Sequence, residues 1–170
     1  MTRQIQVGNV KIGGGAPVVI QSMLNTKTTD VEASLNQIRQ LKAAGCQIAR
    51  LAVPNMESAR TFADICAESE LPLVADIHFD YKLAIAAAEA GAAKIRINPG
   101  NIGGEDRVKA VVDVCRERNI PIRIGVNGGS LDKRLLEKYG HPTAEALVHS
   151  AFEHLELLEK HGFYYTCVSM

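Results

Sequence analysis

Residues 94–127 read KIRINPGNIGGEDRVKAVVDVCRERNIPIRIGVN. Two short apolar runs, KIRIN at residues 94–98 and IRIGVN at residues 122–127, flank a segment at residues 105–118 that has helical character. A glycine-containing loop joins the first run to that segment. This order predicts a strand, a loop, a helix and a second strand, which together form one βαβ unit of a parallel sheet.

The same alternation extends to both sides of this unit. We predict further strands at residues 18–23, 48–53 and 73–79, and helices at residues 31–44, 57–68, 81–90, 131–139 and 143–160. Asp30 is a suitable N-cap for the helix at 31–44, and Gly45 a suitable stop. The N-terminal QIQVGNVKIGGG predicts a small β-hairpin that turns at Gly8-Asn9 and closes one end of a barrel. Residues 163–170 begin a sixth strand.

The strands are near-continuous apolar runs, as in parallel sheets that are covered on both faces. The fold class is therefore α/β. Five strands and the start of a sixth fall short of the eight strands and roughly 250 residues of a (β/α)8 barrel of TIM type. The pattern leaves two possibilities open, an open doubly wound sheet or a partial TIM-type barrel. No linker or low-complexity tract divides residues 1–170, so we expect one domain.

Composition narrows the class of function. The chain has 170 residues, of which 46% are hydrophobic and 22% charged, and its 19 basic residues balance 19 acidic ones. Such a chain has no global charge to attract nucleic acid or an anionic membrane surface. No apolar run approaches the roughly 20 residues that span a bilayer, and no signal-like block begins the chain, so we expect a cytoplasmic protein. The four cysteines form no close pair, which predicts reduced thiols and no metal site.

Polar side chains interrupt the predicted strands at one set of positions. The candidate binding residues are Arg50, Asp76, His78, Arg96, Asn98, Arg123 and Asn127. Alternation along a strand places these side chains on one face, near the C-terminal strand ends where sites on this fold are built. Three arginines against one aspartate favour a phosphate or diphosphate ligand, although internal Arg–Asp bridges are the alternative. His78 is either an interior histidine with its hydrogen bonds made or a substrate contact.

Four of these segments also resemble a known family. APVVIQSMLNTKTTDVEAS, PLVADIHFDYKLA, KIRINPGNIG and IPIRIGVNGGSL are similar to motifs of the 4-hydroxy-3-methylbut-2-enyl diphosphate synthase family, and the resemblance runs from about residue 3 to residue 162. It implies a (β/α)8 barrel followed by a C-terminal domain with a [4Fe-4S] cluster. The implied reaction is the reductive opening of 2-C-methyl-D-erythritol 2,4-cyclodiphosphate in the methylerythritol phosphate route to isoprenoids, with electrons from flavodoxin or ferredoxin.

The resemblance also suggests roles for the candidate residues. Arg96 and Arg123 match arginines that grip the diphosphate, and Arg50 matches a third. Asp76, Asn98 and Asn127 match residues that line the same mouth, while the role of His78 stays open. The family continues with a strand of the form K-I/V-S-V-K, whose last lysine reaches the substrate, but HGFYYTCVSM at residues 161–170 lacks that lysine.

From this departure we expect an incomplete barrel at residues 1–170, without the iron–sulfur domain. None of the four cysteines matches a cluster ligand, so we expect no catalytic residue, metal or bound cofactor in this chain and no activity from it alone. Two alternatives are a non-catalytic phosphate- or diphosphate-binding module and a dihydropteroate-synthase-like barrel enzyme. The exposed edges of a partial barrel also suggest a homodimer.

Overall fold

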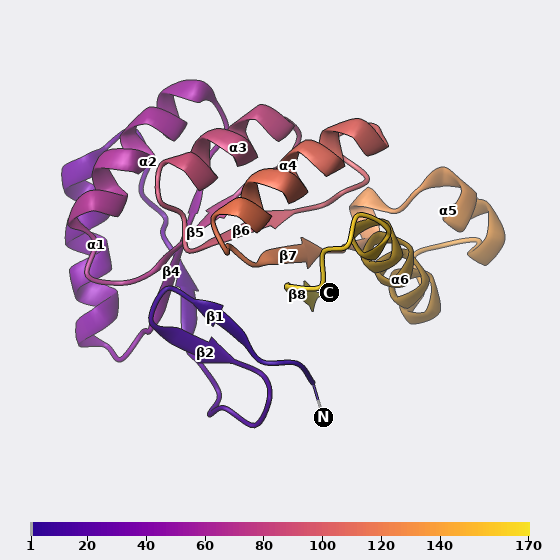
Figure 1. Cartoon of the computed structure of the whole chain (residues 1–170), viewed down its shortest axis with the longest axis horizontal. Coiled ribbons are helices and arrows are strands. Elements are labelled where there is room, and N and C mark those ends of the chain that lie inside the picture. Colours follow the sequence, from indigo (N-terminus) through magenta and orange to yellow (C-terminus); the bar gives the residue numbers. More distant parts are fainter. Residues whose placement is uncertain (1) are drawn as a thin grey trace.

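The computed structural model describes residues 2–170, whose main feature is a six-stranded sheet. Its strand order is β3-β4-β5-β6-β7-β8, and every neighbouring pair is parallel. The strands are β3 (Gln21–Met23), β4 (Ile48–Ala52), β5 (Leu73–Asp76), β6 (Lys94–Ile97), β7 (Ile122–Gly125) and β8 (Thr166–Ser169). Because spatial order follows chain order, the sheet forms a half-barrel and not a doubly wound sheet (Figure 1). The predicted partial barrel and its sixth strand are confirmed.

Helices follow the strands and lie on one side of the sheet (Figure 1). They are α1 (Val31–Ala43), α2 (Met56–Glu68), α3 (Tyr81–Glu89), α4 (Glu105–Glu117), α5 (Lys133–Tyr139) and α6 (Ala144–Lys160), with a short 3-10 turn, η1, at Gly128–Ser130. The Asp30 carboxylate accepts a hydrogen bond from the Ala33 amide, which confirms the predicted N-cap of α1. Gly45, at φ +89°, follows the end of the same helix.

Alternation along the strands separates two faces of the sheet. Ile95, Ile97, Ile122 and Ile124 are fully buried and belong to the core that the sheet shares with its helices. Burial of each such side chain contributes about 1.5–3 kcal/mol. The residues between them, including Arg96 and Arg123, therefore lie on the other face, the concave face of the half-barrel, as the sequence predicted.

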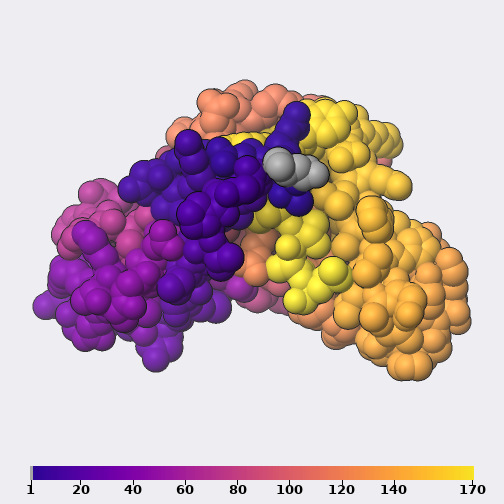
Figure 2. Space-filling model, turned by 90° about the horizontal axis from the view of Figure 1, so that it is seen from below, coloured from indigo at the N-terminus to yellow at the C-terminus, as the bar shows by residue number. Residues whose placement is uncertain are grey.

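A hairpin of β1 (Ile5–Val7) and β2 (Val10–Ile12) covers the N-terminal ends of the strands. Ile5 and Val7 form a second small core with Ile48 and Val74. The backbone of Gln6 hydrogen-bonds the Tyr165 hydroxyl, 159 residues further along the chain. Figure 2 shows the resulting proximity of the two terminal segments, indigo and yellow. The predicted hairpin, and its place at one end of the barrel, are confirmed.

All five strands predicted at residues 18–23, 48–53, 73–79, 94–98 and 122–127 are shorter in the structure, and β3 and β5 differ most, by three residues each. Residues 18–20 lie outside β3, and Val18 is 95% exposed, because the first paired residue of β3 is Gln21, opposite Ile48. Upstream of Ile48 the chain is still turning out of α1 and offers no partner strand. Similarly, β5 ends at Asp76, and residues 77–79 bend toward the N-cap of α3 at Asp80. In the part of the chain that the structure describes, no helix is both long and apolar enough to cross a membrane.

Candidate anion-binding site

Strand register brings the predicted charged residues together on the concave face. Asp76 on β5 pairs with Arg96 on β6, and Arg96 pairs in turn with Arg123 on β7. The same lateral row continues to Cys167 on β8. The parallel pairing of adjacent strands therefore brings residues that are 20 to 50 positions apart in the sequence next to one another.

Asp76 is the centre of an ion-pair cluster. Its carboxylate is 1% exposed and accepts hydrogen bonds from Arg50 Nη2 at 2.5 Å and from Arg96 Nη1 at 3.2 Å. His78 Nε2 lies 3.4 Å from Asp76 Oδ2, although His78 is in the loop after β5 and is half exposed. The Arg–Asp bridges that the sequence left as an alternative thus exist for two of the three arginines.

Arg123 is different, because no carboxylate among residues 2–170 forms an ion pair with it. Its Nε donates a hydrogen bond to Ser169 Oγ at 2.8 Å. Burial lowers the pKa of Arg123, and the positive charge of Arg50 lowers it further. The guanidinium therefore lies in an environment that opposes its charge, which a bound anion would relieve.

Unused hydrogen-bond donors point to the same conclusion. The Nε groups of Arg50 and Arg96 are buried, and neither has a partner among the described residues. A guanidinium presents five donors in a planar fork that matches the oxygens of a phosphate. Three arginines with one carboxylate partner are thus suited to an anion with several oxygens.

The two asparagines lie in the loops that follow the strands. Asn98 is 3% exposed; its Nδ2 donates to Ser130 Oγ at 2.8 Å, and its Oδ1 accepts from the Gly100 amide at 3.1 Å. Asn127 is exposed, and its Oδ1 accepts a hydrogen bond from the same Ser130 hydroxyl at 3.2 Å. Asn98 therefore connects the loop after β6 to the loop after β7, whereas the Asn127 bond lies within the loop after β7. No hydrogen bond or ion pair between residues 2 and 170 joins either asparagine to the Asp76 cluster.

Sequence reasoning overlooked Lys94, Ser169 and Ser130. Lys94 is 2% exposed and donates a hydrogen bond to Gln21 Oε1 at 3.0 Å. It precedes Arg96 by two residues, so the alternation that selected Arg96 also places Lys94 on the concave face. Ser169 lies beside Gly125 in register, a relationship that no local sequence pattern indicates.

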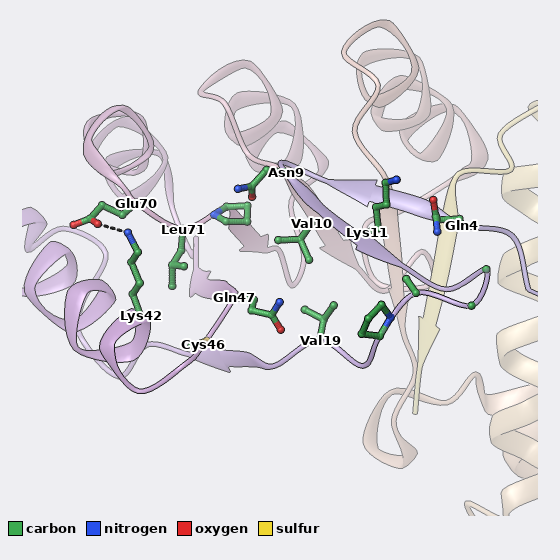
Figure 3. A pocket seen from close by; sticks show the side chains of 15 residues that line it. Gln4, Asn9, Val10, Lys11, Val19, Lys42, Cys46, Gln47, Glu70 and Leu71 are labelled. Carbon is green, nitrogen blue, oxygen red and sulfur yellow. Dashed lines mark hydrogen bonds and ion pairs between the residues drawn. The ribbon is translucent and has the colours of Figure 1, made fainter.

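A cavity of about 720 Å³ lies away from this cluster. It separates the hairpin from the start of β4, with the Lys42–Glu70 ion pair at one end and Lys11 and Gln4 at the other (Figure 3). Residues such as Gln47 and Pro72 place it at the N-terminal strand ends, opposite to where sites on this fold form. A second cavity of about 470 Å³ is lined by Lys94, Arg123 and Cys167.

Comparison with known proteins identifies the family. A sequence profile described as the GcpE TIM-barrel domain matches residues 2–170. The chain belongs to this family. Among curated GcpE-family relatives, the 4-hydroxy-3-methylbut-2-en-1-yl diphosphate synthase (flavodoxin) of Idiomarina loihiensis is 62% identical over 163 residues, which cover 96% of this chain and 44% of the relative. The synthase of the same name from Maridesulfovibrio salexigens is 57% identical over 169 residues, 99% of this chain and 47% of the relative. The chain thus spans less than half the length of these relatives.

Solved structures support the fold of this GcpE-family chain. The 7,8-dihydropteroate synthase of Vibrio fischeri superposes with a TM-score of 0.69 at 12% identity, over 98% of this chain and 66% of the synthase. A truncated 3-deoxy-D-arabino-heptulosonate 7-phosphate synthase from Thermotoga maritima superposes with a TM-score of 0.65 at 16% identity, over 98% of this chain and 56% of that synthase. At these identities the likeness concerns the barrel fold alone. The dihydropteroate-synthase-like alternative therefore reflects shared architecture, whereas the close sequence relatives are synthases of the GcpE family.

Proposed function

We propose that this chain is the substrate-binding barrel part of a 4-hydroxy-3-methylbut-2-enyl diphosphate synthase and binds 2-C-methyl-D-erythritol 2,4-cyclodiphosphate on the concave face of its sheet. The observation that carries the proposal is the convergence of Arg50, Arg96 and Arg123 on one face with a single buried carboxylate. A cyclic diphosphate supplies the negative charge and the oxygens that these arginines lack.

Each candidate residue then has a distinct task. Arg123, which has no carboxylate partner among residues 2–170, binds a phosphate group directly. Arg50 and Arg96 are held in place by Asp76 and present their remaining guanidinium donors to the anion. His78 extends the cluster toward solvent, and Asn98 and Asn127 shape the loops at the mouth.

Reductive C–O cleavage needs electrons, which a [4Fe-4S] cluster supplies in the complete family enzyme. The residues of this chain do not fit such a cluster: within residues 2–170 no three His, Cys, Asp or Glu side chains are grouped to hold a metal, and Cys46 and Cys115 are buried apart from each other in the core. We infer that the cluster ligands lie on polypeptide outside residues 2–170, and we expect no synthase activity from this chain alone.

The names of the curated relatives indicate the electron donor. The names of the Idiomarina and Maridesulfovibrio synthases specify flavodoxin. A flavodoxin, or a ferredoxin in its place, would deliver electrons to the complete enzyme. Synthase activity from the purified 170-residue chain, without any cluster-bearing polypeptide, would contradict the inference that the cluster is held outside this chain.

Calorimetric titration with the cyclic diphosphate tests the binding role, once circular dichroism shows a folded chain. Arg96→Ala and Arg123→Ala should each weaken binding by about 1.5–3 kcal/mol, the contribution of a charge-assisted hydrogen bond. Arg116→Ala, which removes a half-exposed arginine from α4, is the control for the loss of one positive charge. Unchanged affinity in both site variants would indicate that the arginines serve only as bridges between strands.

The same titration with inorganic phosphate distinguishes the synthase role from a second candidate function, that of a non-catalytic anion-binding module. The paired guanidinium groups of Arg50 and Arg96 suit either ligand. Preference for the cyclic diphosphate over inorganic phosphate supports the synthase role, and equal affinity supports the module.

A further inference from the structure

One hydrogen bond crosses the concave face of the sheet between strands that are not neighbours. Lys94 Nζ, on β6, donates to Gln21 Oε1, on β3, at 3.0 Å, and β4 and β5 lie between these two strands. In the part of the chain that the structure describes, the other side-chain hydrogen bonds between strands of the sheet join adjacent strands. The Lys94–Gln21 bond is therefore a cross-sheet bridge.

The cross-sheet bridge depends on the curvature of the sheet. Neighbouring strands lie about 4.7–4.9 Å apart, so three spacings separate β3 from β6 by about 14 Å along the sheet. Ile48 and Val74 occupy the concave face between them and are fully buried, so the two bonded side chains cannot lie flat on the sheet. They meet across the inside of the curve, and the bond holds only while the sheet stays curved.

The bridge is also what offsets the burial of a cation. Lys94 is 2% exposed and forms no other side-chain hydrogen bond or ion pair within residues 2–170. Burial lowers the pKa of its ammonium, and the positive charges of Arg123 and Arg50 lower it further. A buried charge without a counter-charge is costly. An apolar side chain would avoid this cost, but it could not make the bond to Gln21.

The relative positions of the arginines depend on the same curvature. Arg50 is in the same lateral row as Lys94, and Asp76 ties Arg50 to Arg96. Arg123 lies on β7, and no ion pair or side-chain hydrogen bond among the described residues joins it to either of the other arginines. The span from Arg50 on β4 to Arg123 on β7 therefore changes when the sheet flattens.

We propose that the cross-sheet bridge positions the anion site: Lys94 and Gln21 set the curvature of the sheet, and hence the spacing of the three arginines, for a ligand that carries two linked phosphate groups. The inference rests on the anion-binding role proposed for the arginines, and not on the identity of the substrate. Lys94 and Gln21 act as positioning residues without touching the ligand. A ligand with a single phosphate group contacts fewer arginines, so its affinity depends less on their spacing.

Titration calorimetry of the folded 170-residue chain with inorganic pyrophosphate and with inorganic phosphate, at one pH, tests the proposal. Gln21→Leu removes the bridge and leaves every cation in place. It should weaken pyrophosphate binding by about tenfold and phosphate binding by less than about twofold, because two linked groups bind together only where the spacing fits. Lys94→Met removes a positive charge as well as the bridge, so it should weaken both ligands several-fold.

Matched controls separate these effects from the loss of any glutamine or any lysine. Gln40→Leu on the exposed side of α1 and Lys109→Met on α4 should change neither affinity. The double exchange of Lys94→Gln with Gln21→Lys keeps the net charge and again places a lysine opposite a glutamine. It should regain most of the pyrophosphate affinity that Gln21→Leu loses. Circular dichroism establishes that each variant is folded.

Unchanged pyrophosphate affinity in Gln21→Leu, or an equal loss for both ligands, would overturn the proposal. So would a folded exchange variant that binds pyrophosphate no better than Lys94→Met, and this comparison decides the matter if Gln21→Leu does not fold. Failure of the proposed function has a different signature, since the parent would then show no preference for the cyclic diphosphate while the pyrophosphate results still support the bridge. A folded parent chain that bound no phosphate ligand would overturn both.

Discussion

The guanidinium of Arg96 lies against the Cα atom of Gly125 on the neighbouring strand, so that a Cβ added at position 125 would overlap its Nε, Nη2 and Cζ atoms. Gly125 is not required for its backbone conformation, since its φ is not in the left-handed region. The glycine is needed because the arginine occupies the space of a side chain. Arg96 in turn holds Asp76 through its Nη1.

Gly125→Ala should therefore displace Arg96 and impair the binding site, although the substitution changes no charged residue. We expect diphosphate binding to weaken by about 1.5–3 kcal/mol, as for Arg96→Ala, because the same charge-assisted contact is lost. Titration calorimetry measures the effect. Gly104→Ala is the matched control, since a Cβ there meets no atom within 4 Å. Equal affinity of both variants and the parent would show that Arg96 has room to move without loss.

Asp76 should be more important for stability than any exposed carboxylate. Asp76→Asn leaves Arg50 and Arg96 close together without their counter-charge, and breaking a buried pair of this kind costs about 3–5 kcal/mol. The lower end applies here because both arginines retain some exposure to solvent. Urea unfolding followed by circular dichroism gives the free energy of unfolding. Asp113→Asn removes a carboxylate that also contacts two basic residues, but on the surface of α4, and should cost well under 1 kcal/mol.

Much of this fold follows from the sequence because its signals are local. The alternation of apolar strands and capped helices predicted the parallel order, and period-two alternation placed Arg96 and Arg123 on one face. The ends of strands were less predictable, because they depend on a partner: β3 begins at Gln21 only where Ile48 lies opposite. The choice between a barrel-like and a doubly wound sheet also needed the observed strand order.

The site was predictable as a set of residues but not as a set of contacts. The sequence gives equal standing to three arginines, whereas the structure pairs Arg50 and Arg96 with Asp76 and leaves Arg123 with Ser169. That difference depends on lateral register across the five strands β4 to β8. Lys94 was overlooked because a lysine at the start of a strand is normally solvated, whereas here it is 2% exposed and hydrogen-bonds Gln21 on β3.

Buried thiols should make the protein sensitive to alkaline pH. Burial raises the pKa of Cys115 from 9.0 to about 12. Above pH 9 the unfolded chain loses this proton while the folded chain keeps it, so the unfolded state binds fewer protons and the free energy of unfolding falls as pH rises toward 12. The expected slope is about 1.4 kcal/mol per pH unit for each such thiol.

Urea unfolding at a series of pH values checks this expectation. Cys115→Ala should be less stable than the parent near neutral pH, because it leaves a small cavity, but its stability should decline less steeply above pH 9. Val112→Ala removes comparable volume from the same helix without a titrating group, so its curve should run parallel to that of the parent. Parallel curves for all three proteins would mean that Cys115 ionises equally easily in the folded and unfolded chains.

We predict that copies of the purified 170-residue chain associate through the two edges of the sheet. In the sheet formed by residues 2–170, β3 and β8 each have a single neighbour, so the outer backbone groups of both strands are free to pair. Val168 on β8 is 37% exposed, and no charged residue of that strand protects the edge. We expect concentration-dependent dimers by size-exclusion chromatography with light scattering.

Val168→Lys should shift this equilibrium toward monomer, because a lysine on an edge strand opposes pairing with a second sheet. Val148→Lys is a close match, since it introduces the same charge at a 41% exposed valine on α6, outside the sheet. If both lysine variants dissociate the dimer equally, net charge and not the strand edge controls association. If neither variant changes the elution, the β8 edge is not the contact between the two copies. The copies then meet through another surface, and the concave face stays accessible to ligand only if that surface lies elsewhere.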